Sequence, residues 1–169
     1  MQLTKAHAYG NDFLFVRRRD LGASDLAATA RRLCDRHRGA GGDGLILYDL
    51  TPEGASMRLF NADGSPAELS GNGLRALAAI VIRHRGDASQ VVAGAEVVIA
   101  TDAGPRPLTL VDRAGPRFTF RAGMGLPADL RTATIDAGGE QVRASVFTIG
   151  NPQCVLLGPL PDEERFARV

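Results

Sequence analysis

The residues that could most directly do chemistry lie between positions 60 and 75. A polar turn at residues 61–64 leads to the glycine-rich sequence Ser70-Gly71-Asn72-Gly73, which precedes an apolar stretch. If that stretch is a helix, its first backbone N–H groups have no intrahelical partner and lie at the positive end of the helix dipole. Such an end binds an anion such as a carboxylate, and glycine lets the anion approach closely. We therefore predict an anion site near Gly71.

Ser70 has two interpretations at this position. Serine is among the preferred N-cap residues, so Ser70 could simply begin the helix. Its hydroxyl could instead act on whatever the helix amides bind. The spacing alone leaves both interpretations open, because a glycine-rich helix start is a weak signal by itself.

Cysteines and histidines add few further candidates. Cys34 lies on the apolar face of an expected helix and Cys154 in an apolar strand-like run, so both are expected in the core. No CxxC pair or His/Cys/Asp group has the spacing of metal ligands, so we predict no metal site and no cofactor. His37 and His84 lie near the ends of expected helices and are interpreted as structural. His7 falls in an N-terminal motif and is expected to help shape the site.

The loop at residues 39–44 suggests a third site, for a nucleotide. It contains several glycines, which allow backbone conformations that other residues avoid. However, it has neither the lysine of GxxxxGK[ST] nor the GxGxxG spacing after a strand. We therefore consider nucleotide binding the weakest hypothesis.

Two helices and a series of strands must position these residues. We predict a helix at 24–37, capped by Ser24, and a buried helix at 74–84 that is apolar nearly all round. The expected strands are residues 1–5, 12–17, 45–48, 56–61, 96–101, 107–111, 117–121, 141–149 and 154–157. Antiparallel hairpins around a central helix, without alternating βαβ units, indicate an α+β fold.

Two lobes are expected, at residues 1–113 and 114–169, with the boundary in the segment 112–116. The second lobe would be only partly present in this chain. Residues 160–169 are expected to begin a helix that the chain end interrupts. Exposed apolar surface on a half-built lobe would favour association with the missing C-terminal half or with a second copy.

The overall composition excludes several classes of partner. Hydrophobic residues make up 44% and charged residues 23% of the chain, as in ordinary soluble globular proteins. A formal net charge of +1 gives no electrostatic footprint for nucleic acid or an anionic membrane. No stretch resembles a signal peptide or a span of about 20 apolar residues. With only two cysteines, a reducing, cytoplasmic setting fits best.

Five short sequences carry a family resemblance: Ala6-His7-Ala8-Tyr9-Gly10-Asn11-Asp12-Phe13, Gly41-Gly42-Asp43-Gly44, Arg58-Leu59-Phe60-Asn61-Ala62-Asp63-Gly64-Ser65, Gly71-Asn72-Gly73-Leu74-Arg75 and Gly150-Asn151-Pro152. In this order they are similar to motifs of the diaminopimelate epimerase family. Ordered matches across nearly the whole chain are more specific than any single one. The resemblance implies two similar lobes, each a curved, mostly antiparallel sheet around a central helix, with the substrate between them.

The resemblance also implies residue roles. Asn11, Asn61 and Asn151 match asparagines that hold an amino acid substrate, while Gly71 and Asn72 match residues whose amides take its α-carboxylate. From the residues alone, the three asparagines could equally be turn or loop formers. The implied activity is epimerisation of L,L- to meso-diaminopimelate, a lysine and peptidoglycan precursor, without pyridoxal phosphate.

Two positions depart from the family pattern. Removing an α-proton from one face and returning one to the other requires two acid/base groups, for which the family uses cysteines. The first cysteine corresponds to Ser70, whose hydroxyl is a much weaker acid than a thiol. The histidine that supports it corresponds to Gln153, which can hydrogen-bond to a ligand but cannot take a proton. The second cysteine belongs to a glycine-rich motif that does not occur before Val169.

Two hypotheses from different classes follow. In the first, the chain is a fragment of an amino acid epimerase in which Ser70 serves as one acid/base group or proton transfer is one-sided. A serine here is also found in the related proline racemase group. In the second, the chain is a non-catalytic homologue that binds an amino acid or a partner. A third explanation is that serine was introduced at position 70 in place of cysteine by engineering, but this would not account for Gln153 in place of histidine. We favour the first hypothesis and expect the chain alone to be inactive.

Overall fold

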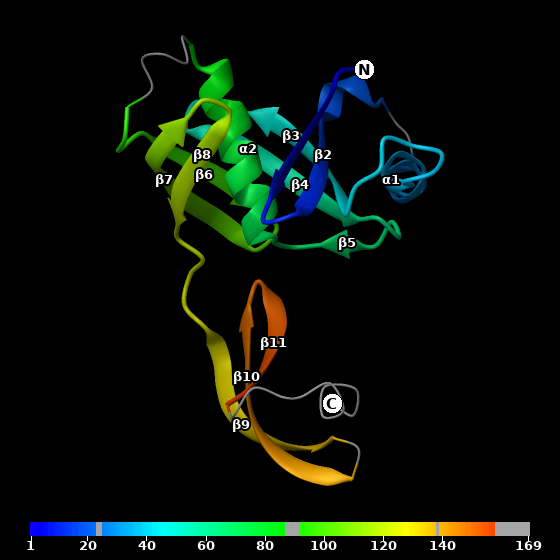
Figure 1. Cartoon of the computed structure of the whole chain (residues 1–169), viewed down its shortest axis with the longest axis vertical. Helices are drawn as coiled ribbons and strands as arrows, with labels where there is room; N and C mark the ends of the chain where they lie inside the picture. The colour runs from blue at the N-terminus through cyan, green and yellow to red at the C-terminus, as the bar shows by residue number, and fades with distance from the viewer. Residues whose placement is uncertain (23–24, 87–91, 138, 158–169) are drawn as a thin grey trace. The chain divides into compact units, whose positions relative to one another are not determined.

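The structure is a computed structural model that describes residues 1–22, 25–86, 92–137 and 139–157 (Figure 1). The chain divides into two compact units, Met1–Met124 and Gly125–Val169. The predicted boundary at 112–116 instead lies within a hairpin of the first unit. Gly115 turns this hairpin with a φ of 58°, so the turn-forming residues that suggested a linker connect two paired strands.

The first unit is built on one sheet of eight strands. Its strands are β1 (Leu3–Ala8), β2 (Asn11–Arg17), β3 (Gly44–Leu50), β4 (Gly54–Asn61), β5 (Pro66–Ala67), β6 (Glu96–Thr101), β7 (Gly104–Ala114) and β8 (Arg117–Ala122). The strand order is β1-β2-β3-β4-β6-β7-β8, with β5 paired to β4. Only β2–β3 and β4–β6 pair in parallel among these strands, so the predicted, mostly antiparallel sheet is confirmed.

Helix α2 (Gly71–His84) lies against one face of this sheet, as Figure 1 shows. Leu74 and Leu77 are fully buried, and the helix shares one apolar cluster with side chains of β2, β3, β4, β6, β7 and β8. The predicted buried helix is therefore confirmed. It begins three residues before the predicted Leu74 because Ser70 caps it.

A second helix, α1 (Leu26–Cys34), contributes to a separate apolar cluster. Alternate residues of β2 serve the two clusters: Phe13 and Phe15 pack with α2, whereas Leu14 and Val16 pack with Ala30 and Cys34 of α1. Because successive strand side chains point to opposite faces, α1 and α2 cover opposite faces of the sheet. This explains why β2 is apolar over four consecutive residues.

Helix α1 is shorter than the predicted 24–37. Its N-cap is Asp25, whose carboxylate accepts from the Ala28 N–H at 3.1 Å; Ser24, the predicted cap, lies outside the described residues. At the other end, Asp35 accepts from the backbone N–H groups of His37 and Arg38 at 2.7 and 3.0 Å. This side-chain turn replaces helical backbone bonds and ends the helix at Cys34.

The glycine-rich loop after α1 folds back onto the end of that helix. The N–H groups of Gly41 and Gly42 donate to the carbonyls of Leu33 and Cys34, both at 3.1 Å. A Cβ at Gly39 would lie 2.3 Å from the Arg32 carbonyl oxygen, so only glycine fits there. The loop amides thus satisfy the last carbonyls of α1, which argues against the nucleotide hypothesis.

The second unit contains a three-stranded antiparallel sheet in the order β11-β10-β9. Its strands are β9 (Ala128–Ala137), β10 (Glu140–Ile149) and β11 (Asn151–Leu156). The sequence did not predict β9, because its alternating small and polar residues give little apolar pattern. The predicted helix at 160–169 lies outside the described residues.

Of the helices in the described residues, neither α1 nor α2 is long and apolar enough to cross a bilayer. The short 3-10 turn η1 (Arg18–Asp20) completes the helical elements in the described ranges.

Truncating Leu77 should test the packing of α2. Leu77→Ala should lower the free energy of unfolding of the first unit by about 2–5 kcal/mol, because it leaves a cavity in the core. Leu50→Ala makes the same change at a residue that is 38% exposed and should cost about 1 kcal/mol or less. Urea unfolding followed by circular dichroism measures both. Equal losses for the two variants would contradict the burial of α2.

Candidate functional site at the start of helix α2

Ser70 caps α2 in the structure. Its backbone is extended, and its Oγ accepts from the Gly73 N–H at 3.1 Å, while its carbonyl accepts from the Leu74 N–H at 2.9 Å. The N-cap interpretation is therefore confirmed. The side chain is half-buried and keeps its own proton, because the cap uses only an oxygen lone pair. A catalytic role for Ser70 stays a prediction.

The two glycines of the helix start have different roles. A Cβ at Gly73 would lie 2.7 Å from Cδ1 of Ile46, so glycine here lets the helix pack closely on the sheet. This differs from our expectation that Gly73 admits an anion. The nearest neighbours of a Cβ at Gly71 would be Met124 and Arg75, at ordinary contact distances of 3.5 and 3.7 Å. Gly71 and Asn72 keep backbone N–H groups that helix geometry leaves without intrahelical acceptors.

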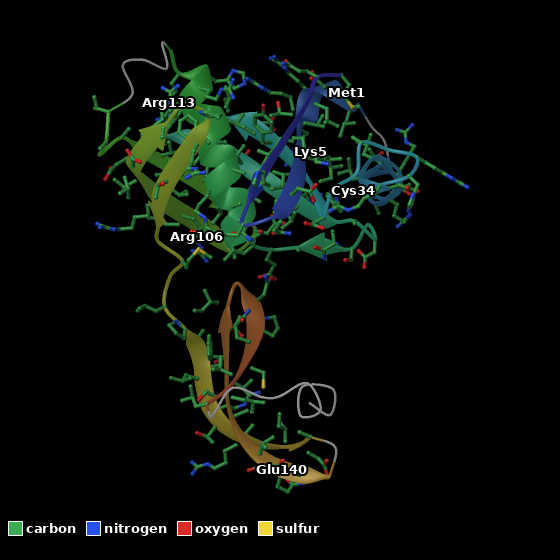
Figure 2. The ribbon with its side chains drawn as sticks, in the orientation of Figure 1. Met1, Lys5, Cys34, Arg106, Arg113 and Glu140 are labelled. Carbon is green, nitrogen blue, oxygen red and sulfur yellow. The ribbon has the colours of Figure 1, made fainter. Side chains whose placement is uncertain are left out.

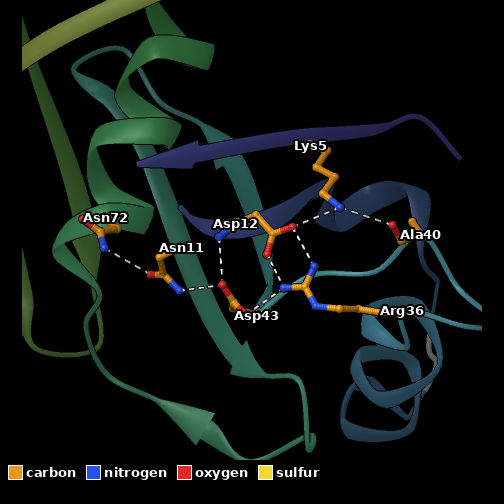
Figure 3. Close-up of polar contacts among 7 residues, drawn as sticks. All are labelled: Lys5, Asn11, Asp12, Arg36, Ala40, Asp43 and Asn72. Carbon is orange, nitrogen blue, oxygen red and sulfur yellow. Dashed lines mark hydrogen bonds and ion pairs between the residues drawn. The ribbon is translucent and has the colours of Figure 1, made fainter. Parts of the chain in front are cut away.

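Asn11 and Asn72 lie together although 61 residues separate them. The Nδ2 of Asn72 donates to the Oδ1 of Asn11 at 3.2 Å, and both side chains are half-buried. Asn11 in turn donates to the Oδ2 of Asp43 at 2.9 Å. Figure 3 shows this line of contacts running from α2 to the loop that precedes β3. The fold thus brings two of the predicted substrate-binding residues to one place.

Asn61 is the last residue of β4 and lies beside the start of β3. It pairs with Gly44, and the next residue, Ala62, donates its N–H to the Asp43 carbonyl at 3.1 Å. The Asn61 side chain donates to Ser65 Oγ at 2.9 Å, within its own turn. The turn-forming interpretation of Asn61 is therefore confirmed, and a role in substrate binding stays a prediction.

Asn151 and Gln153 belong to the second unit. Asn151 follows the turn at Gly150 and is half-buried, whereas Gln153 is exposed. The Nε2 of Gln153 donates to the Asn151 carbonyl at 3.5 Å, a long hydrogen bond. Their predicted roles toward substrate stay predictions.

Asn11 contacts a charged cluster that was not predicted from the sequence. Arg36 donates through both Nη atoms to the Asp12 carboxylate, at 2.6 and 3.1 Å, and to Asp43 at 2.9 Å. Lys5 lies 3.0 Å from Asp12. The Arg36 hydrogen bonds, followed by those of Lys5, hold the pKa of Asp12 well below its usual range. Asp12 and Asp43 lie within two of the matched motifs, and this was the one signal that could have identified them.

Arg75 and Tyr9 complete the polar surroundings of Asn72. Arg75 donates to the Oδ1 of Asn72, and its guanidinium lies 5.7 Å from the centre of the Tyr9 ring. Tyr9 and Gly10 form the two-residue turn between β1 and β2, with φ values of 54° and 85°. Positive φ at both positions is typical of a type I′ turn, in which tyrosine is unusual at the first position. Tyr9 is 93% exposed.

Comparison with known proteins decides the family. A sequence model of diaminopimelate epimerases matches residues 3–127. The chain belongs to the diaminopimelate epimerase family. It is 38% identical to the diaminopimelate epimerase of Desulforudis audaxviator over 99% of this chain, and 35% identical to that of Pelotomaculum thermopropionicum over 92% of it. It spans 64% and 60% of the lengths of these two relatives.

Solved structures share the fold of this family member. A hydroxyproline epimerase from Agrobacterium vitis, with bound trans-4-hydroxy-L-proline, matches with a TM-score of 0.63 at 13% identity, over 98% of this chain and 52% of the other. A predicted epimerase from Pseudomonas aeruginosa matches with a TM-score of 0.65 at 21% identity, over 94% and 56%. At such identities the likeness concerns the fold, and it confirms the predicted epimerase-like α+β architecture.

The two cysteines of this diaminopimelate epimerase homologue lie in different environments. Cys34, labelled in Figure 2, is the last residue of α1 and is buried, and burial raises the pKa of its thiol to about 11. Cys154 is exposed, which corrects its predicted core position. It lies on β11, at the edge of a three-stranded sheet, and no described element covers its side chain. Among the described residues, no group of three or more His, Cys, Asp or Glu could hold a metal ion.

Thiol labelling should separate these two cysteines. At pH 8, iodoacetamide should modify Cys154 rapidly and Cys34 at least ten-fold more slowly, because a raised pKa leaves little thiolate and burial blocks access. Labelling of Cys34 should rise only as the pH approaches 11 or the protein unfolds. Mass spectrometry of the native protein measures both, with Cys154→Ser as the control. Equal labelling at pH 8 would contradict the buried position of Cys34.

Proposed function

We propose that the protein acts as an amino acid epimerase that interconverts L,L- and meso-diaminopimelate without pyridoxal phosphate. The observation that carries this proposal is the Asn72–Asn11 hydrogen bond beside the free amides of α2. Both residues occupy positions that family resemblance assigns to substrate binding. An amino acid ligand also agrees with the hydroxyproline bound by one structural neighbour. The proposed setting is lysine biosynthesis in the cytoplasm.

The start of α2 provides the proposed carboxylate site. The amides of Gly71 and Asn72 lie at the positive end of a buried, well-packed helix, where an anion is favoured. Asn11 begins β2 and Asn61 ends β4, the two strands that flank β3. Their side-chain amides would bind the ammonium or the carboxylate oxygens. The roles toward substrate that the family resemblance implies for Asn151 and Gln153 remain part of the proposal.

The proposed site lacks the side chains that the family uses for proton transfer. Ser70 replaces the thiol of the family, and its Oγ is already the acceptor of the N-cap bond. Gln153 replaces the supporting histidine and cannot take up a proton. We therefore propose that the 169-residue chain binds an amino acid but does not epimerise it. In a protein of the relatives' length, the second acid/base group would come from residues outside this chain.

A non-catalytic homologue is the second candidate function. The same pair of residues favours it, because serine and glutamine preserve shape and hydrogen bonding while they remove both proton-transfer groups. Such a protein would bind an amino acid, or a partner that presents a carboxylate, at the start of α2. Only proton exchange separates the two candidates.

Solvent exchange and calorimetry test the proposal. The chain should bind L,L-diaminopimelate with a Kd on the order of 1 mM, about 4 kcal/mol, and should not bind cadaverine, the same diamine without carboxylates. In deuterated water it should incorporate no α-deuterium. The double variant Ser70→Cys, Gln153→His should incorporate α-deuterium at about 10²-fold or more above the protein-free background, since it restores a thiol at a helix start and a base.

Three outcomes would count against parts of this proposal. Failure to bind diaminopimelate would refute it altogether. Deuterium incorporation by the wild-type chain would show that Ser70 suffices for proton transfer and would refute the non-catalytic alternative. Binding without exchange, even in the double variant, would favour that alternative.

A further inference from the structure

A chain of side-chain hydrogen bonds connects Arg36, near the end of α1, to Arg75 in the first turns of α2. Arg36 donates to Asp43 Oδ1 at 2.9 Å, and Asp43 Oδ2 accepts from Asn11 Nδ2 at 2.9 Å. Asn11 Oδ1 accepts from Asn72 Nδ2 at 3.2 Å, and Asn72 Oδ1 accepts from Arg75. Figure 3 shows the line from Arg36 to Asn72. We name these five residues the asparagine relay.

The charged ends determine the orientation of both asparagines. A side-chain amide can turn by 180°, exchanging its donor and its acceptor, so Asn11 and Asn72 could each point either way. A carboxylate only accepts and a guanidinium only donates. Asp43 therefore requires the amide nitrogen of Asn11 on its side, and Arg75 requires the oxygen of Asn72. The two requirements agree at the Asn11–Asn72 bond, where one amide donates and the other accepts.

Asp43 is itself tightly positioned. Its Oδ2 also accepts from the Asp12 backbone N–H at 2.9 Å, so both carboxylate oxygens have partners. The side chains of Arg36 and Asp43 are 53% and 40% exposed, and ion pairs with such exposure add little to folding stability. The arrangement is better explained by the geometry that it imposes on Asn11.

Arg75 is positioned from the opposite side. Its guanidinium lies 5.7 Å from the centre of the Tyr9 ring, a cation–π distance. The ring reaches this position from a turn residue with a φ of 54°, a conformation that tyrosine rarely adopts. Non-glycine residues in such sparsely populated backbone conformations cluster at functional sites.

We propose that Asp43 and Arg75 are positioning residues that lock the side-chain amides of Asn11 and Asn72 for substrate binding. The relay uses one N–H and one oxygen lone pair of each asparagine, which leaves one of each for a ligand. An amino acid needs both, because its carboxylate accepts and its ammonium donates. This inference rests on the proposed function, since only a ligand at the start of α2 would use these groups.

The test compares three variants of the 169-residue chain. Asp43→Asn removes the acceptor-only end of the relay, and Arg75→Met removes the donor-only end but keeps a side chain of similar length. Asp49→Asn is the matched control, because it removes the same charge from the other end of β3, where Asp49 pairs with Arg18 at 3.5 Å. Circular dichroism and thermal unfolding confirm that each variant folds.

The first measurement is the side-chain amide signal of Asn72 in nitrogen-15 NMR spectra. Asp43→Asn should shift this signal and speed its hydrogen exchange, although Asp43 touches Asn72 only through Asn11. Arg75→Met should do the same to the Asn11 signal, and Asp49→Asn should change neither. Unchanged signals in both relay variants would overturn the relay, whatever the ligand result.

The second measurement is calorimetric titration with L,L-diaminopimelate. Each relay variant should raise the Kd about ten-fold, because a charge-assisted hydrogen bond that orients the site is lost, while Asp49→Asn should leave the Kd unchanged. Equal Kd values in wild type and relay variants would overturn the positioning role. If the wild-type chain binds no diaminopimelate, the proposed function and the positioning role both fail. The amide signals would then still show whether the relay exists.

Discussion

The backbone N–H groups of the first turn of α2, which lack intrahelical acceptors, are the feature on which the proposed site depends. They are useful only if the helix cannot move, and its burial against six strands provides that rigidity. Gly73 lets the helix approach Ile46, and Ser70 satisfies one of the free N–H groups through its cap. What remains is a rigid, positively polarised end beside Asn11. A carboxylate is the group that such an end accommodates best.

Membership of the diaminopimelate epimerase family gives this geometry a chemical context. The proposal is limited by the two positions, Ser70 and Gln153, at which the family resemblance implies a departure from the family pattern. At the first acid/base position, serine keeps the N-cap bond that a cysteine side chain would make only weakly. Glutamine at position 153 likewise keeps hydrogen bonding without basicity. In the proposed site, binding and proton transfer therefore rest on different residues. We propose that the asparagine relay serves binding, because its amide groups can donate to and accept from a ligand but cannot act as acid/base groups.

Sequence patterns predicted the elements that carry strong apolar periodicity. The strand at 96–101 and the buried helix before His84 follow from it directly. β9 was missed because its side chains are mostly exposed and leave no apolar signal. Cys154 was placed in the core because an apolar run does not reveal whether another element covers the strand. The matched motifs contain Asp12 and Asp43, but their contacts with Arg36 could not be predicted, since the three residues come from separate segments that only the fold brings together.

Backbone amide shifts during titration with L,L-diaminopimelate test the central claim most directly. In a nitrogen-15 spectrum, the signals of Gly71 and Asn72 should move most and should saturate together, because a carboxylate would accept from those N–H groups. The signal of Gly73 should move less, since its N–H already donates to Ser70. Shifts spread over the surface, with Gly71 and Asn72 unchanged at saturating ligand, would contradict a carboxylate site at the start of α2.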